Sequence, residues 1–240
     1  MLCGSGTLFQ ATVDGLHYGF GSSGLLFRSN KLMYDDRTNS LWHHMTGEPV
    51  LGPLARSGIR LRVLPAVVAT WKEWRAAHPD TRVLDIQTGY QRDYRPGRPY
   101  GAYFTSPDTM FPVSPRSAEL PTKASVLAVR VGAASKIYPL EVFAREPVVN
   151  DRVGATQVVV VGRADSRTAR AYVRGGRRFQ PGGSPAELLE VGRGIRWRVE
   201  EERLVNPATG ETLPRLGAHL VYWFGWHAFY PDAELYRPGR

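Results

Sequence analysis

Two ten-residue segments, one in each half of the chain, match at four positions, two of which are tryptophan. Residues 71–80 and residues 223–232 both read W-x-x-W-x-x-x-x-P-D, and the two segments lie 152 positions apart. An identity at this separation indicates an internal duplication, which constrains the architecture before any single strand or helix is assigned. We therefore expect two similar halves, and a reactive side chain found in only one half is the better candidate for chemistry.

A second match defines the extent of the repeats. Thr46-Gly47-Glu48 recurs at residues 209–211, at an offset of 163 positions. The predicted organisation is a first repeat over residues 1–91, a proline- and tyrosine-rich joining segment over 92–122 and a second repeat over 123–240. Extending the offset backwards leaves residues 136–163 without counterparts, so we expect the first repeat to lack its first ~28 residues and the chain as given to begin within a structural unit.

Composition and local patterns favour strands over helices. The chain holds 25 glycines, 18 prolines and abundant aromatic residues, as turn-rich β proteins do. Asp14-Gly15 predicts a tight hairpin, Val68–Ala77 a short helix with Thr70 as N-cap, and Val83–Gln87 a strand. The expected fold class is mainly β, a β-rich α+β protein with a few short helices, in which two degenerate internal repeats pack into one globular unit. The four tryptophans of the repeated motif are expected to be core anchors: Trp71, Trp74, Trp223 and Trp226.

The charge of the chain is strongly basic. The formal net charge is +9, and all but four of the 31 basic residues are arginine. Arginine is spread along the whole chain and no nucleic-acid-binding motif is present, so nucleic acid is an unlikely partner and polyanion binding is the weakest functional hypothesis. No apolar run approaches the ~20 residues that span a bilayer, so the chain as given is expected to be soluble.

A long signature links the chain to a known family. Residues 20–42 read FGSSGLLFRSNKLMYDDRTNSLW, followed by TGEPV at 46–50, HPD at 78–80 and TGY at 88–90. With these motifs the chain resembles the bacterial domain-of-unknown-function family numbered 3179, from Leu2 to about Asp232. The resemblance names no reaction. It implies that many relatives are exported or attached to the cell envelope, which leaves the compartment of this chain undecided.

The same resemblance directs attention to the N-terminus. Family members typically carry Cys-x-x-Cys-Gly-(Ser/Thr), and Cys3-Gly4-Ser5 matches its second half, whereas the first cysteine has no counterpart in this chain. Two such thiolates could hold a metal ion or form a disulfide. Alone, Cys3 is a candidate nucleophile or a single ligand of a soft metal, or else a buried thiol without chemistry.

Several polar residues of the first repeat have no counterpart in the second. The candidates for catalysis are Cys3, Asp35 and Asp36; those for a copper-type metal site are Cys3, Met33 and His43; and those for binding are Asn30, Tyr34 and Trp42. Neighbouring His43 and His44 would face opposite sides of a strand, so they would not share one site without a bulge. The alternative for Asp35, Asp36 and Asn30 is the capping of tight turns.

These observations leave the function open between three classes of protein. The first is a binding or accessory protein whose site lies in the first repeat. The second is a thiol- or metal-dependent enzyme or metal handler that uses Cys3 and an upstream cysteine, with a transition metal such as copper as the only cofactor considered. The third is polyanion binding. Whether the protein is an enzyme, and what its partners are, the sequence does not decide.

Overall fold

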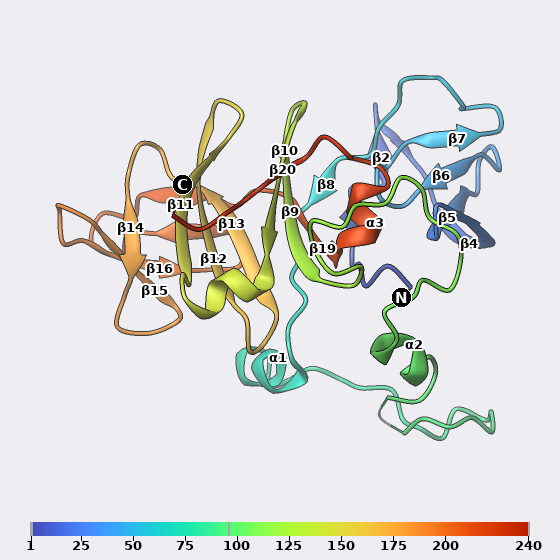
Figure 1. Cartoon of the computed structure of the whole chain (residues 1–240), viewed down its shortest axis with the longest axis horizontal. Coiled ribbons are helices and arrows are strands. Elements are labelled where there is room, and N and C mark those ends of the chain that lie inside the picture. Colours follow the sequence, from blue (N-terminus) through green and yellow to red (C-terminus); the bar gives the residue numbers. More distant parts are fainter. Residues whose placement is uncertain (1, 96, 240) are drawn as a thin grey trace.

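The computed structural model describes residues 2–95 and 97–239 of the chain. The fold is mainly β, as predicted, with short helices and several small sheets (Figure 1). In the first part of the chain the elements are β1 (Leu8–Phe9), β2 (Thr12–Val13), β3 (Leu16–His17), β4 (Phe20–Phe27), β5 (Asn30–Asp35), β6 (Leu41–His43), β7 (Pro49–Leu51), β8 (Val63–Leu64), α1 (Trp71–Ala77) and α2 (Gly101–Thr105).

The remaining elements follow residue 124. They are β9 (Ser125–Val131), β10 (Ala134–Pro139), the 3₁₀ turn η1 (Leu140–Ala144), β11 (Val148–Val153), β12 (Thr156–Arg163), β13 (Thr168–Val173), β14 (Phe179–Pro181), β15 (Glu187–Glu190), β16 (Arg196–Val199), β17 (Arg203–Val205), β18 (Thr212–Pro214), β19 (Ala218–Tyr222), α3 (Trp223–His227) and β20 (Glu234–Leu235).

A four-stranded sheet in the order β19-β9-β10-β20 lies between the two ends of the molecule (Figure 1). On one side of it are β11–β13 and the meander β14–β18, and on the other is the meander β4–β7. The N-terminal segment joins this central sheet, because Gly6 forms a β-bridge with Leu220 of β19. Residues from the start of the chain are thereby packed against its last helix.

The first meander is organised around a buried tryptophan. β4 pairs with β5 so that Phe20 lies opposite Asp35, and a bulge between Ser22 and Leu26 accommodates Gly24 at φ +78°. Trp42 is fully buried, meets the Phe20 ring edge-on at 5.4 Å, and donates its indole hydrogen to Asp35 at 2.8 Å. The predicted hairpin is confirmed beside it, with Asp14 and Gly15 at positive φ between β2 and β3.

The second meander repeats this arrangement with different residues. Phe179 lies opposite Glu190, and its ring meets that of buried Trp197 edge-on at 5.8 Å. The Trp197 indole donates to Glu190 at 3.0 Å. The two meanders therefore share a Phe–Trp–carboxylate core, while the duplication of the whole chain stays a prediction.

The motif that first suggested a repeat has two different environments. Trp223 and Trp226 of α3 are buried, as expected of core anchors. Trp71 and Trp74 of α1 are 52% and 40% exposed, so their prediction as core anchors is wrong. The predicted helix itself is confirmed, since Thr70 and Glu73 form a capping box at its start. Local capping stabilises this helix, and no residue of it is buried.

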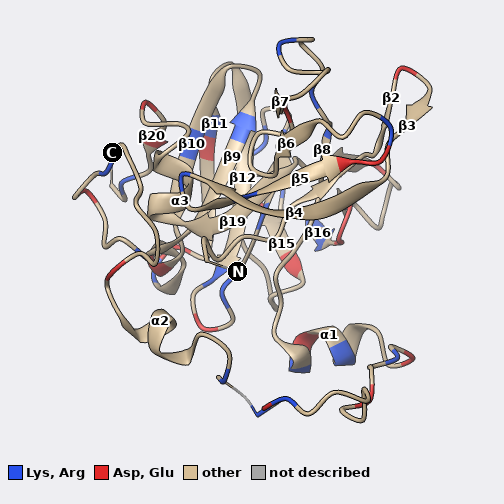
Figure 2. Cartoon of the chain, turned by 90° about the vertical axis from the view of Figure 1, so that its right-hand side faces the viewer, with Lys and Arg blue, Asp and Glu red and all other residues tan. Residues whose placement is uncertain are grey.

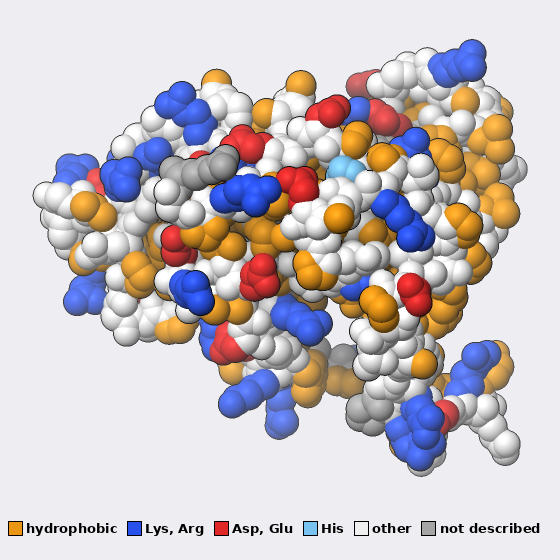
Figure 3. Space-filling model, in the orientation of Figure 1, with side chains coloured by type: hydrophobic (Ala, Val, Ile, Leu, Met, Phe, Trp, Pro, Cys, Tyr) orange, Lys and Arg blue, Asp and Glu red, His pale blue; other side chains and the backbone are white. Residues whose placement is uncertain are grey.

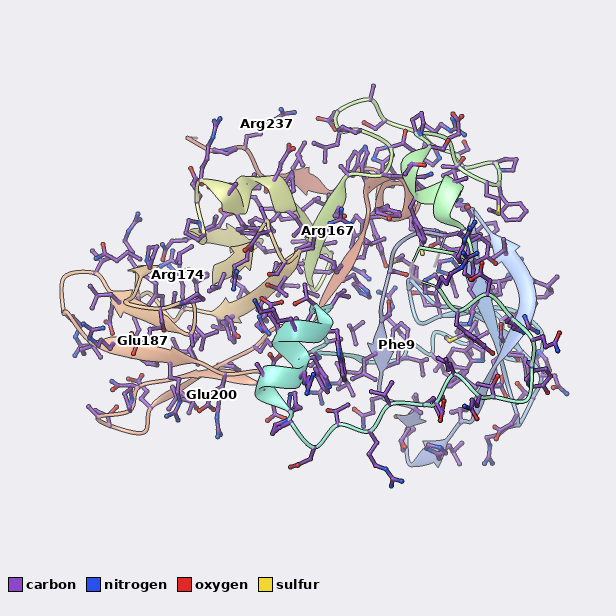
Figure 4. The ribbon with its side chains drawn as sticks, turned by 90° about the horizontal axis from the view of Figure 1, so that it is seen from below. Phe9, Arg167, Arg174, Glu187, Glu200 and Arg237 are labelled. Carbon is purple, nitrogen blue, oxygen red and sulfur yellow. The ribbon has the colours of Figure 1, made fainter. Side chains whose placement is uncertain are left out.

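The chain between α1 and the start of the joining segment runs along the outside of the molecule (Figure 4). Residues 83–87 do not form the predicted strand, because no neighbouring strand supplies partners for their backbone groups, and Leu84 is 91% exposed. Further along, Tyr103 and Val113 are buried, and the carbonyl of Ser117 accepts a hydrogen bond from the Trp223 indole at 3.3 Å. This part of the segment thus packs against α3.

Charge and apolar surface are distributed differently over the fold. Lys and Arg positions are interspersed with Asp and Glu positions along the ribbon (Figure 2). Exposed apolar side chains gather along the edge occupied by β4 and β7 (Figure 3), where Leu25, Phe27 and Leu51 are among the most exposed. Among the residues that the structure describes, none of the helices has the length and apolar character needed to cross a membrane.

Candidate functional site: a cysteine, a serine and a histidine at the N-terminus

The backbone around Cys3 is held by the end of β19 and by α3. The Tyr222 amide donates to the Cys3 carbonyl at 2.8 Å. A side chain at Gly225 would come within 2.9 Å of the Cys3 β-carbon, and Gly4 adopts φ +65° against the Tyr222 ring. The two glycines therefore permit a close approach that fixes the position of the thiol.

Three side chains converge at this point. The Cys3 sulfur lies 2.9 Å from Ser5 Oγ and 3.7 Å from His44 Nε2. Ser5 Oγ is also 3.0 Å from His44 Nε2, so the hydroxyl bridges the thiol and the imidazole. Cys3 is 3% exposed, whereas Ser5 and His44 are half-buried and face the cavity described below.

The orientation of His44 is set by the neighbouring strand. Its Nδ1 lies 3.0 Å from the carbonyl oxygen of Lys31 in β5. A carbonyl oxygen can only accept, so we assign the ring hydrogen to Nδ1, and the Nε2 lone pair then faces Ser5 and Cys3. This is the arrangement of a nucleophile, a base and a group that orients the base.

The surroundings change the acidity of the thiol. Burial alone would raise the pKa of Cys3, but the hydrogen bond and charge of His44, together with the Ser5 hydrogen bonds, lower it to about 7. A large fraction of the sulfur is therefore thiolate at neutral pH, and the thiolate is the nucleophilic form.

A cavity of about 380 Å³ opens beside these groups, lined by Leu2, Cys3, Ser5, Leu26, Ser29, Lys31, His44 and Tyr100. All of these except Tyr100 belong to the first 91 residues. A cavity with apolar walls and a few convergent polar groups is the usual form of a small-molecule site.

The start of α2 closes one side of this cavity. Tyr100 adopts φ +69° at the N-terminal end of α2, and the Tyr103 hydroxyl donates to the Leu2 carbonyl at 2.5 Å. Burial, with the nearby Tyr222 and Cys3, raises the pKa of Tyr103 to about 12, so its hydroxyl stays protonated and keeps this bond. Lys123 caps the C-terminal end of α2 by donating to the carbonyls of Tyr103 and Ser106.

His43 does not take part in the cluster. Its Nδ1 accepts the amide hydrogens of Met45 and Thr46 at 3.2 and 3.3 Å, and its ring stacks on Phe229 with centroids 4.0 Å apart. Burial, with the charges of His44 and Arg28, lowers the pKa of His43 to about 3, so it remains neutral. Its role is to cap a turn in the core, and the predicted ligand role is not supported.

The proposed copper-type set is not assembled. Met33 packs with the cluster around Trp42, whereas Cys3 packs with Trp226. Among residues 2–95 and 97–239, no three His, Cys, Asp or Glu side chains come together as a metal site would require. The strand β6 ends at His43, which is held within the core, whereas His44 lies in the turn that follows and reaches Cys3.

Asp35 and Asp36, predicted as catalytic candidates, act within turns. Asp35 is fully buried and accepts hydrogen bonds from five donors: the amides of Arg37, Thr38 and Ser40, the Thr38 hydroxyl and the Trp42 indole. Burial opposes ionisation, but these bonds keep the pKa of Asp35 below its usual value. Asp36 is exposed and accepts the Gly19 amide at 2.9 Å. Neither carboxylate lines the Cys3 cavity.

The predicted binding residues also lie outside the cavity. Asn30 is fully buried and donates to the Arg28 carbonyl in the β4–β5 turn. Tyr34 covers Gly21 on the neighbouring strand, and Trp42 is the centre of the meander core. The residues that do line the cavity are their neighbours Ser29 and Lys31.

The sequence did not point to Ser5 or Lys31 as site residues, and of the two adjacent histidines His43 was chosen as the candidate ligand instead of His44. Two sequence features could have pointed to them: Ser5 is two residues from Cys3, and His44 is adjacent to His43. Which of the two histidines faces the thiol depends on the packing of β6 against the N-terminal segment, which the sequence does not specify.

The fold and the site thus define a mainly β protein that has a cysteine, a serine and a histidine beside a small cavity. The chain belongs to the family described as "Protein of unknown function (DUF3179)", whose model matches residues 1–233. Comparison with curated proteins and with solved structures finds no match.

Proposed function

We propose that the protein performs thiol-dependent covalent chemistry on a small molecule bound beside Cys3. The observation that carries this proposal is the convergence of Cys3, Ser5 and His44, with His44 oriented by the Lys31 carbonyl. Serine and histidine close to a buried, acidic thiol meet the requirements for an activated nucleophile. All three residues belong to the first 91 residues of the chain.

The geometry favours acyl transfer as the reaction class. The separation of 3.7 Å between Cys3 Sγ and His44 Nε2 is long for direct proton transfer, and Ser5 Oγ lies within 3.0 Å of both atoms. In the proposed step Ser5 passes the thiol proton to Nε2. The sulfur then attacks the carbonyl carbon of an ester or thioester, and the departing alkoxide or thiolate takes the proton from His44.

The second half of the reaction restores the cysteine. The acyl group is now held as a thioester on Cys3. His44 accepts a proton from water, the resulting hydroxide attacks the thioester carbon, and the carboxylic acid is released while the sulfur regains its proton through Ser5. The cavity of about 380 Å³ limits the substrate to a small molecule, and Leu2 and Leu26 favour an apolar acyl part.

The first test measures the acidity of the thiol. Cys3 is the only cysteine of the chain, so alkylation by iodoacetamide, followed by intact mass, reports this site alone. We expect the rate to reach half its maximum near pH 7, matching the pKa of about 7. His44→Gln should move the midpoint toward the ordinary value of 9.0. His17→Gln, at an exposed histidine, serves as the matched control and should leave it unchanged.

The second test measures turnover of short-chain p-nitrophenyl esters and thioesters. We expect an initial burst of product, a covalent acyl adduct on Cys3, and loss of both in Cys3→Ser. Substrate analogues that bind the wild type and Cys3→Ala equally, without an adduct or turnover in either, would instead support the non-catalytic binding role. A thiol midpoint near pH 9 in the wild type would contradict the proposal directly.

The metal-handling alternative fits the residues only in part. Cys3 and His44 supply one soft and one borderline donor, which suit copper or zinc, but two side chains do not complete a site of the usual kind. We therefore derive no chemistry through a metal. Copper or zinc retained by the wild type after dialysis and lost in both Cys3→Ser and His44→Gln would favour that alternative.

A further inference from the structure

We propose that a second cavity, on the other side of the turn that carries His44, binds a tetrahedral oxyanion such as phosphate, free or as a monoester. The cavity has a volume of about 210 Å³ and lies where the segment 45–46, the segment 60–63, β9 and β19 meet. The side chains used in the argument are Thr46, Arg60, Arg62, Arg130, His219 and Tyr230.

Three arginines from two segments surround this cavity. Arg60 and Arg62 are two residues apart on an extended segment that leads into β8, so both side chains can lie on the same side of it. Arg130 comes from β9, and its guanidinium lies 5.0 Å from the centre of the Tyr230 ring. The Tyr230 hydroxyl accepts from Arg130 at 3.2 Å, which places a further donor at the same wall.

The positive charge at the cavity is only partly balanced by acidic residues. Arg60 pairs with Glu48, but neither Arg62 nor Arg130 has an acidic partner among the residues that the structure describes. His219 remains neutral, because burial together with the charges of His44 and Arg130 lowers its pKa to about 4. The groups at the cavity therefore carry a net positive charge, which is suited to an anion with more than one negative charge.

Two residues of the cavity lining each have a buried polar atom without a partner. Arg130 Nε and Thr46 Oγ1 are buried and have no hydrogen-bond partner. Buried donors without partners are uncommon in folded proteins and call for an explanation such as a bound ion or water. Guanidinium groups bind phosphate oxygens through paired N–H groups, and hydroxyls complete the set, so a tetrahedral oxyanion matches these donors.

This site is separate from the thiol site. The turn after β6 presents His44 to the Cys3 cavity, whereas Met45 and Thr46 line the second cavity. The proposal therefore does not depend on the chemistry of Cys3. A phosphate bound here would contact residues that are far apart in the sequence, such as Arg62 and Tyr230.

The test is calorimetric titration with inorganic phosphate at constant ionic strength, using chloride as the reference and acetate as the singly charged comparison. We expect phosphate and sulfate to bind and acetate to bind at least ~10-fold more weakly, because fewer charge-assisted hydrogen bonds form. Phenyl phosphate in a parallel titration distinguishes a free ion from a monoester. Absence of phosphate and sulfate binding up to millimolar concentrations, or tighter binding of acetate, would overturn the proposal.

Variants locate the binding. Arg62→Gln changes an exposed side chain and should raise the phosphate Kd by ~10-fold, as should Arg130→Gln if it folds. Arg82→Gln removes an exposed arginine elsewhere and is the matched control, expected to be unchanged. Glu48→Gln should tighten phosphate binding several-fold, since it frees Arg60 and removes a negative charge. Tighter binding by Glu48→Gln cannot be attributed to damage to the fold, because such damage would weaken binding. A phosphate Kd that is the same in all four variants would refute the site.

Discussion

The two meanders, β4–β7 and β14–β18, share a similar core and one turn with the same backbone hydrogen bonds, but the side chains of that turn differ. In the turn after β6, the His43 amide donates to the Glu48 carbonyl and the Gly47 amide donates to the His43 carbonyl. In the turn after β17, Asn206, Glu211 and Gly210 make the same two bonds. The backbone of this turn is thus formed in both halves, whichever residue occupies it.

The side chains of the two turns explain why only one meander carries a candidate site. His43 and Asn206 both accept amide hydrogens two residues further on, so they serve the turn itself. The next residue is His44 in the first meander and Pro207 in the second. Proline has no side-chain donor or acceptor, whereas His44 faces Cys3. The comparison separates a histidine that caps the turn from a histidine that contacts Ser5 and Cys3.

The largest effect is expected from the tryptophans at the centre of each meander. Trp42→Ala and Trp197→Ala should each lower the free energy of unfolding by ~3–5 kcal/mol, because both rings are fully buried. Urea unfolding followed by circular dichroism measures the loss. Trp71→Ala, at a 52% exposed position, is the matched control and should change stability by at most ~0.5 kcal/mol. Very different losses for Trp42 and Trp197 would break the comparison of the two cores.

The second test concerns Asp35, the carboxylate that accepts from the Trp42 indole. Asp35→Ala leaves several buried donors without an acceptor and should cost ~2–3 kcal/mol, again by urea unfolding. Because its pKa is lowered in the folded state, the stabilisation by Asp35 is present above its ordinary pKa of 3.8 and is lost as the pH falls through the folded value. Asp36→Ala, at the exposed neighbour, is the control. A loss in Asp36→Ala as large as in Asp35→Ala would contradict this account.

A smaller, pH-dependent effect distinguishes His43 from His44. The unfolded chain protonates His43 near pH 6.5, but the folded chain does so only near pH 3, so this residue lowers stability as the pH falls from 6.5 toward 3. The slope it contributes is at most about 1.4 kcal/mol per pH unit. His43→Asn, which copies the cap of the second turn, should remove that slope, as measured by urea midpoints at pH 7, 6 and 5.

The control for this test uses the adjacent histidine. His43→Asn should leave the alkylation midpoint of Cys3 near pH 7, since the ring makes no hydrogen bond to the thiol. His44→Gln should shift that midpoint. If His43→Asn moved the thiol midpoint as far as His44→Gln does, the assignment of the two roles would be wrong.

The sequence by itself determined the features that depend on near neighbours. Asp14-Gly15 specified a hairpin because both residues tolerate positive φ, and Thr70 with Glu73 specified the start of α1 because a capping box is a local interaction. The β-rich class and the family also followed from the residues alone, and Cys3 was among the candidate residues that the sequence offered. The strand over residues 83–87 failed because strand formation requires a partner that no local pattern reveals.

Only the tertiary structure decided which side chains meet. The same W-x-x-W motif is exposed in α1 and buried in α3, because burial depends on what packs against a helix. His44 reaches Cys3 across 41 positions of sequence, and Arg130 reaches the cavity beside Arg62 from a different sheet. Such contacts depend on how the sheets pack against one another, and this packing cannot be predicted from the spacing of residues along the chain.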